Sequence, residues 1–129
     1  MICCLDTHTL VWFLTGDARL SAKARRAIRE SEERFIVPTI VLLEIRYLAA
    51  KSRIPVELSD IDTMVLARSD CIIWPMDEHV VHRAPLSLNI HDAIICGSAL
   101  SYRDSRNEAV CVVTRDQEIT EWAGLPVIW

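Results

Sequence analysis

The sequence lacks several features that would place the chain in familiar classes of protein. It has no apolar run long enough to cross a bilayer, and Met1 leads directly into an apolar segment without a basic flank. We therefore expect neither a membrane span nor a signal peptide. The five cysteines are odd in number and form no C-x-x-C pair, which disfavours a disulfide framework or a zinc site. These absences favour a cytoplasmic protein whose cysteines are small buried side chains.

Lysine is scarce, because only two of the 14 basic residues, Lys23 and Lys51, are lysines. The net charge is −4, so the molecule as a whole has no general attraction for nucleic acid. The other basic residues are arginines, whose planar fork suits phosphate or carboxylate. Arg25, Arg26 and Arg29 share one short helical segment. Each alone is typical of a solvated helix face, whereas the group could contact a polyanion.

What the sequence does contain is a regular alternation of short apolar runs and helical segments. Its 129 residues, 51% hydrophobic and 25% charged, fit a single globular domain spanning residues 1–129. The expected strands are Ile2–Leu5, Phe35–Val37, Cys71–Trp74, Val110–Thr114 and Pro126–Trp129. Strands that alternate with helical crossovers predict an α/β fold. We expect a three-layer α/β/α sandwich around a mainly parallel sheet of four to five strands.

The helical segments have recognisable start signals. Thr7, Ser21 and Thr39 are placed to cap the helices that follow them, with the Ser21 helix running to about Glu33. Acidic residues after Pro55 predict a helix over about 56–67, since acids are favoured in a first turn. A further helix is expected from residue 92 to about residue 102.

Four acidic residues lie where a parallel sheet gathers its ligand-binding groups. Asp6 and Asp116 follow the carboxyl ends of two strands, and Asp92 begins a helix at the same edge. Glu44 lies in the apolar run Val41–Ile45, about one and a half turns into its helix. Taken alone, Asp92 could be an ordinary acidic cap and Glu44 part of a polar surface stripe. Together the four carboxylates would repel one another unless a cation lay among them.

All-carboxylate ligands favour Mg²⁺ or Mn²⁺ over zinc. We expect Asp6, Asp92 and Asp116 to bind the metal, with Glu44 completing a catalytic group of four. Two divalent ions would cancel the four formal charges, and the site would then attract phosphate. Such an arrangement is typical of nucleases that activate water for attack on a phosphodiester.

These residues carry a resemblance to a known family. The motifs are Leu-Asp-Thr-His at 5–8, Leu-Glu-Ile at 43–45, His-Asp-Ala-Ile-Ile at 91–95 and Val-Thr-Arg-Asp at 113–116. Over nearly its whole length the chain resembles the PIN-domain ribonucleases, in particular the VapC-type toxins of prokaryotic toxin–antitoxin pairs. The resemblance implies magnesium-dependent cleavage of single-stranded or looped RNA, a homodimer, and inhibition by a small antitoxin protein.

The resemblance also assigns residues to the site. Asp6, Glu44, Asp92 and Asp116 take the family's four acidic positions, and Thr114 takes its hydroxyl position. Thr7 and His91 are expected to support the site, His91 by proton transfer or by a structural role. Family members often have a further acid near the third position, where this chain has Asn89 and His91. One metal ion and two metal ions therefore both remain open.

Three other functions fit parts of the pattern. A receiver-like phosphoacceptor domain would place adjacent acids after the first strand and a lysine after the last, but no lysine follows Lys51. An aspartyl phosphatase would have a second acid two residues after Asp6, where this chain has His8. A non-catalytic binding module with this fold has no need of four converging acids. The sequence therefore favours a metal-dependent endoribonuclease.

Overall fold

The computed structural model describes residues 1–31 and 34–129, and its centre is a five-stranded parallel sheet. The strands lie in the order β3-β2-β1-β4-β5, and each neighbouring pair is parallel. They are β1 (Ile2–Leu5), β2 (Phe35–Pro38), β3 (Cys71–Trp74), β4 (Val110–Val113) and β5 (Val127–Ile128). The predicted α/β class, with a mainly parallel sheet of four to five strands, is confirmed.

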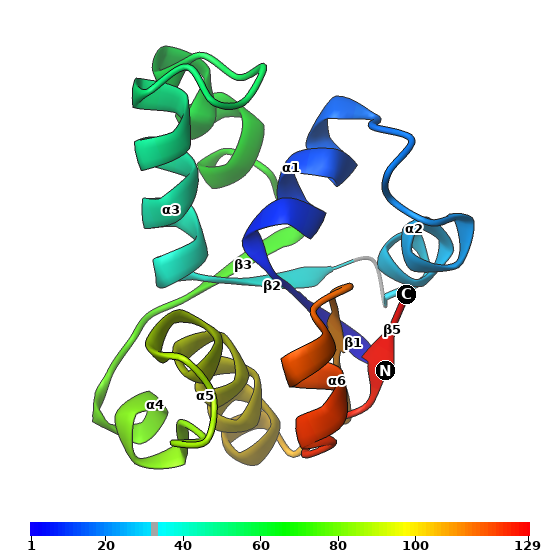
Figure 1. Cartoon of the computed structure of the whole chain (residues 1–129), viewed down its shortest axis with the longest axis vertical. Coiled ribbons are helices and arrows are strands. Elements are labelled where there is room, and N and C mark those ends of the chain that lie inside the picture. The colour runs from blue at the N-terminus through cyan, green and yellow to red at the C-terminus, as the bar shows by residue number, and fades with distance from the viewer. Residues whose placement is uncertain (32–33) are drawn as a thin grey trace.

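Helices cover both faces of this sheet (Figure 1). One side carries α1 (Thr7–Thr15), α2 (Ala22–Arg29) and α3 (Thr39–Ala50), and the other carries α4 (Glu78–Arg83), α5 (Ile90–Arg106) and α6 (Gln117–Trp122). The short η1 (Leu58–Asp60) and η2 (Asp62–Leu66) precede β3. The chain moves outward from β1 through β2 to β3, and then crosses back to β4 on the other side of β1. This reversal creates a switch point between β1 and β4, where open α/β sheets bind their ligands.

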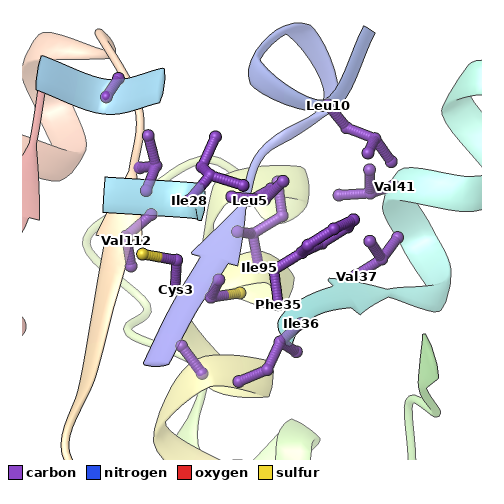
Figure 2. Close-up of a cluster of buried hydrophobic side chains, with 14 of the residues drawn as sticks. Cys3, Leu5, Leu10, Ile28, Phe35, Ile36, Val37, Val41, Ile95 and Val112 are labelled. Atoms are coloured by element: carbon purple, nitrogen blue, oxygen red, sulfur yellow. The ribbon is translucent and has the colours of Figure 1, made fainter. Parts of the chain in front are cut away.

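The three central strands are buried at every position, as strands between two helical layers must be. Alternate side chains of β1 face opposite layers: the Cys3 thiol contacts the Ala27 carbonyl oxygen of α2, and Cys4 faces Cys96 of α5. Figure 2 shows the core around these strands, in which Leu5 and Phe35 lie among side chains from α1 and α3 such as Leu10 and Val41. This packing fixes the ends of β1 and β4, from which two of the acids project.

The caps of two helices differ from the prediction. Asp6, and not Thr7, caps α1, because its extended backbone lets Oδ1 accept the Thr9 N–H at 2.9 Å. Helix α3 has no side-chain cap, and the Thr39 hydroxyl instead accepts the Met76 N–H at 3.2 Å. The predicted caps were therefore wrong at Thr7 and Thr39 and right at Ser21, which accepts the Ala24 N–H.

The helix predicted over residues 56–67 was also wrong. This segment forms a short 3₁₀ turn and a π-helical turn. Its buried side chains, Val56, Ile61 and Val65, are first five and then four residues apart, so no regular 3.6-residue repeat can bury all three. Helix α2 ends at Arg29, before the predicted end, and Glu32 and Glu33 lie outside the described residues. Helix α5 runs on to Arg106, past its predicted end. None of the helices in the described ranges has the length and apolarity that a bilayer crossing demands.

Candidate active site

A cavity of about 670 Å³ opens at the carboxyl ends of β1 and β4, at the switch point of the sheet. Four acids from four different segments line it: Asp6, Glu44, Asp92 and Asp116. These are the four residues that the sequence predicted would meet. The four acids are spread over more than a hundred residues of the chain, so it is the topology of the parallel sheet that brings them together.

Asp6 is held at both carboxylate oxygens. Oδ1 accepts the Thr9 N–H at the start of α1, and Oδ2 accepts the Thr114 hydroxyl. The same Thr114 oxygen accepts the Asp116 N–H at 3.0 Å, so this fully buried threonine joins the first and last acids. The Thr9 hydroxyl adds a second connection by donating to the Val113 carbonyl oxygen at 2.8 Å. The orientation of Asp6 is therefore determined by β4 as well as by its own helix.

Asp116 occupies the equivalent place after β4. It caps α6, and its Oδ1 accepts the Ile119 N–H at 2.9 Å. Asp6 and Asp116 thus both lie at helix N-termini, where exposed N–H groups and the helix dipole stabilise negative charge. Each of the two carboxylates is thus oriented by a backbone N–H of the helix that it caps.

Asp92 lies in the first turn of α5 and is not its cap. Asn89 caps that helix by accepting the Asp92 N–H at 3.0 Å, and the Asn89 amide also donates to Asp92 Oδ2. Partial burial raises the pKa of Asp92, the Asn89 hydrogen bond opposes that rise, and the charges of Asp116, Asp6 and Glu118 add to it. The direction of this shift shows that the cavity favours a neutral or cation-bound carboxyl group.

The buried thiol of Cys96 responds to the same negative charge. Burial and, to a smaller extent, the charges of Asp92, Asp116 and Asp6 together raise its pKa to about 12. Glu118, expected from the sequence to start the last helix near the site, lies in the first turn of α6 and adds to this field.

Glu44 and His91 close the cavity from α3 and α5. Glu44 Oε1 is buried and has no hydrogen-bond donor among the described residues, although His91 Nδ1 lies 3.5 Å from it. The carboxylate oxygen is therefore left without a donor. A buried oxygen in this state is costly unless a ligand or water satisfies it.

The chain matches the family model for the PIN domain over residues 3–125. It belongs to the PIN-domain family. No curated protein matches it closely enough to count as a relative. Among solved structures it is similar to a chain in the crystal structure of VapBC2 from Rickettsia felis bound to a DNA fragment from their promoter. The TM-score is 0.68 at 16% identity, covering 98% of this chain and 97% of that chain.

These comparisons confirm the resemblance to PIN domains, and the similar chain comes from a VapBC complex, as the likeness to VapC-type toxins predicts. At 16% identity the similarity to VapBC2 shows the shared fold. PIN domains are in general nucleases that depend on divalent metal ions.

The donor atoms of this PIN domain fit such an ion. Across residues 1–31 and 34–129, no three His, Cys, Asp or Glu side chains are placed to hold one ion among them. Mg²⁺ usually binds proteins through one or two carboxylates and keeps several of its waters, so it does not need a closed cage. Carboxylate oxygens around an open cavity, with Glu44 Oε1 lacking a donor, match this mode of binding.

Sequence reasoning placed the acids but missed other groups that line the cavity. Trp12 is buried in the core and its ring also lines the wall of the cavity, where the centre of the His8 ring lies 5.7 Å from it. Arg19 and Arg115 also line it, and both contact the Trp12 ring, Arg19 from seven residues further along the chain and Arg115 from a distant segment. Asp17, predicted to be a turn residue, pairs with Arg19. The Thr7 hydroxyl is buried without a partner in the described structure and lines the same cavity.

Proposed function

We propose that this PIN domain is a divalent-metal-dependent endoribonuclease and the toxin of a toxin–antitoxin pair acting in the cytoplasm. The observation that carries the proposal is the convergence of Asp6, Glu44, Asp92 and Asp116 on one open cavity. Four acids on one cavity are costly for folding unless they bind a cation, and the expected cations are Mg²⁺ or Mn²⁺.

Asp6, Asp92 and Asp116 are the proposed metal ligands, and since no three described side chains are placed to hold one ion directly, some of them would act through its bound waters. A divalent ion bound there supplies Lewis-acid activation of water and offsets the charge that develops on the phosphate. Glu44 contributes the fourth carboxylate from the opposite wall, where it can orient a water or a phosphate-bound ion. Whether one or two ions bind depends on how many waters the four carboxylates share.

The surrounding residues hold these carboxylates in place. Thr114 joins Asp6 to Asp116, and Asn89 fixes Asp92 through its side chain. His91 stands beside Glu44 at the mouth of the cavity, more than half exposed, where it can exchange a proton with solvent. Pre-set carboxylates of this kind need little rearrangement when the substrate binds, and this lowers the barrier to reaction.

The decisive experiment measures cleavage of an RNA that contains single-stranded and looped regions, with Mg²⁺ and with EDTA. We expect cleavage in Mg²⁺ only, and loss of at least a hundredfold in Asp6→Asn and Asp92→Asn, since each removes a ligand while keeping the side-chain shape. Asp60→Asn, on the exposed η1 turn, is the matched control and should cleave normally.

The other outcomes identify the competing functions. Cleavage that persists in EDTA would contradict a metal-dependent mechanism. Hydrolysis of a small phosphoester with RNA left intact would indicate a metal-dependent phosphoesterase of another class. RNA binding without cleavage would indicate a non-catalytic PIN-like module.

An apolar groove beside the cavity supports the proposed antitoxin partner. Leu43 and Tyr47, both exposed on α3, line a groove of about 440 Å³ that shares His8, Glu44 and His91 with the acid cavity. A partner segment seated there could extend a basic side chain to the carboxylates. Co-expression with the proposed antitoxin should give a stable complex that Leu43→Asp weakens, whereas failure of the unsubstituted chain to retain a small protein partner would count against this docking site.

A second apolar surface supports the proposed homodimer. Leu86, in the segment that connects α4 with α5, is 92% exposed, Ile90, at the start of α5, is 72% exposed, and Val81 of α4 lies near them. Exposed apolar side chains in such a group are typical of interaction surfaces. Sedimentation should give a dimer mass that Leu86→Asp reduces to that of a monomer.

A further inference from the structure

Two arginines line the same cavity as the four acids, and they differ in one respect. Arg19, which follows α1, forms a two-pronged pair with Asp17: Nε donates to Oδ1 at 3.1 Å and Nη2 donates to Oδ2 at 2.8 Å. These bonds lower the pKa of Asp17 to about 2. The fork of Arg19 is therefore already occupied by a carboxylate.

Arg115 has no acidic partner anywhere in the described structure. Its guanidinium lies against two aromatic rings, 5.8 Å from the centre of Trp12 and 6.0 Å from the centre of Trp129. Neither ring contact uses the N–H groups as hydrogen-bond donors to an oxygen, so the fork of N–H donors stays available for a ligand. The side chain is exposed at the cavity, and yet it forms no ion pair with the acids around it.

The position of Arg115 in the chain makes this arrangement informative. It stands between Thr114, which holds Asp6, and Asp116, which caps α6. The backbone that sets the two carboxylates therefore also sets the guanidinium beside them. An unpaired guanidinium on the rim of an acidic cavity is suited to a ligand that reaches both the arginine and the acids. Such a ligand would offer negative charge to the arginine and oxygen atoms to a metal ion held by the acids.

We infer that Arg115, held by Trp12 and Trp129, binds a backbone phosphate of the RNA strand and positions that strand over the acids. This inference rests on the proposed nuclease function and adds a phosphate-binding residue to it. A phosphate accepts two N–H bonds from one arginine fork, which gives orientation as well as attraction. Because a phosphate lacks a base edge, this contact holds the strand in register without selecting its sequence.

A phosphate explains the arrangement better than a protein carboxylate does. A single protein carboxylate could pair with the arginine but would bring no second anionic group to a metal ion held by the acids. A nucleotide strand brings one phosphate to the arginine and a neighbouring phosphate to the metal ion. The positive charges of the arginine and of the bound ion are then matched at once. Arg19, already matched by Asp17, is not expected to take this role.

The test measures binding of a fluorescently labelled single-stranded RNA by anisotropy, in Mg²⁺ and over a range of salt concentrations. All variants carry Asp6→Asn to prevent cleavage during the measurement. We expect Arg115→Gln to weaken binding about tenfold, because one charge-assisted contact is lost. The slope of log affinity against log salt should fall by about 0.7, the value for one single-strand phosphate.

Two variants keep the interpretation specific. Arg115→Lys retains the charge without the fork, so it should keep the salt slope and lose only part of the affinity. Arg106→Gln, an exposed arginine at the opposite end of α5 from Asp92 and outside the acid cavity, removes the same net charge and should leave both quantities unchanged. Thermal melting of each variant excludes unfolding as the cause.

The inference fails if Arg115→Gln leaves the affinity and salt slope unchanged, as it would if the arginine served a protein carboxylate or only packed on the two rings. It also fails if Arg106→Gln causes an equal loss, because the effect would then be general net charge. The proposed nuclease function is judged separately, by cleavage in the chain that retains Asp6. Cleavage with unchanged binding in Arg115→Gln would overturn this inference alone, and Arg115-dependent binding without cleavage would overturn the nuclease function alone.

Discussion

Individual side chains in the cavity serve the site but lower the stability of the fold. Asp92 is the clearest case, because partial burial raises its pKa and three nearby acids raise it further, against one opposing hydrogen bond from Asn89. Its folded form therefore holds a proton more tightly than the unfolded chain does. The stability that this group contributes is fully present below its unfolded pKa, about 3.9, and is lost as the pH rises through the higher folded value.

The first prediction follows from the direction of this pKa shift. In EDTA at neutral pH, Asp92→Asn should raise the melting temperature by about 2 °C, because it removes a partly buried charge while an amide oxygen can still accept the Asn89 hydrogen bond. Near pH 3 the difference should disappear, since the carboxyl group is then protonated in the unsubstituted chain. Melting curves at the two pH values test this, and the exposed Asp60→Asn should shift neither. A lower melting temperature at neutral pH would show that Asp92 stabilises the metal-free fold.

At the scale of elements, the packing of α4 against α5 depends on one glycine. A Cβ on Gly97 would lie 2.8 Å from the Val80 carbonyl oxygen and 3.0 Å from the Ala84 Cα. Both are backbone atoms of the α4 segment, which cannot yield as a flexible side chain would. The absent side chain therefore allows the two helices to approach, and α5 is the helix that carries Asp92.

The second prediction is a reversal of the usual effect of alanine. Glycine to alanine inside a helix normally stabilises by about 1 kcal/mol. Gly97→Ala should instead destabilise by about 1–3 kcal/mol, because overpacking must push α4 and α5 apart. Urea unfolding measures the difference, with Ser105→Ala on the exposed part of α5 as the control that should change little. Stabilisation by Gly97→Ala would mean that the helices separate without cost.

The elements also show how far sequence patterns reach. The strands were predictable because each is a short apolar run in a parallel sheet, and the three central ones are buried throughout. The conformation of segment 56–67 was not predictable, since its buried residues Val56, Ile61 and Val65 follow no helical period. Asp6 and Asn89 were not foreseen as caps, because capping depends on backbone angles at a single residue, and neighbouring Thr7 and Asp92 had equally suitable side chains.

At the scale of the whole molecule, the meeting of four distant acids was predictable from topology alone. Parallel strands place their carboxyl ends at one edge, so Asp6 and Asp116 had to lie near each other once β1 and β4 were neighbours. The aromatic support of Arg115 was not predictable. It depends on Trp12 and Trp129 meeting across the fold, and no spacing along the chain encodes that contact.

The third prediction uses the whole molecule as a metal sensor, without RNA. An ion that binds only the folded chain stabilises it by about 2.7 kcal/mol at a hundred times its dissociation constant. Mg²⁺ should therefore raise the melting temperature of the unsubstituted chain and of Asp60→Asn, whereas Asp6→Asn and Asp116→Asn should respond much less. Sodium chloride at the same ionic strength separates this effect from general screening of the net charge of −4. If sodium chloride stabilised the chain as much as Mg²⁺ did, the four carboxylates would be a screened acidic cluster and not a metal site.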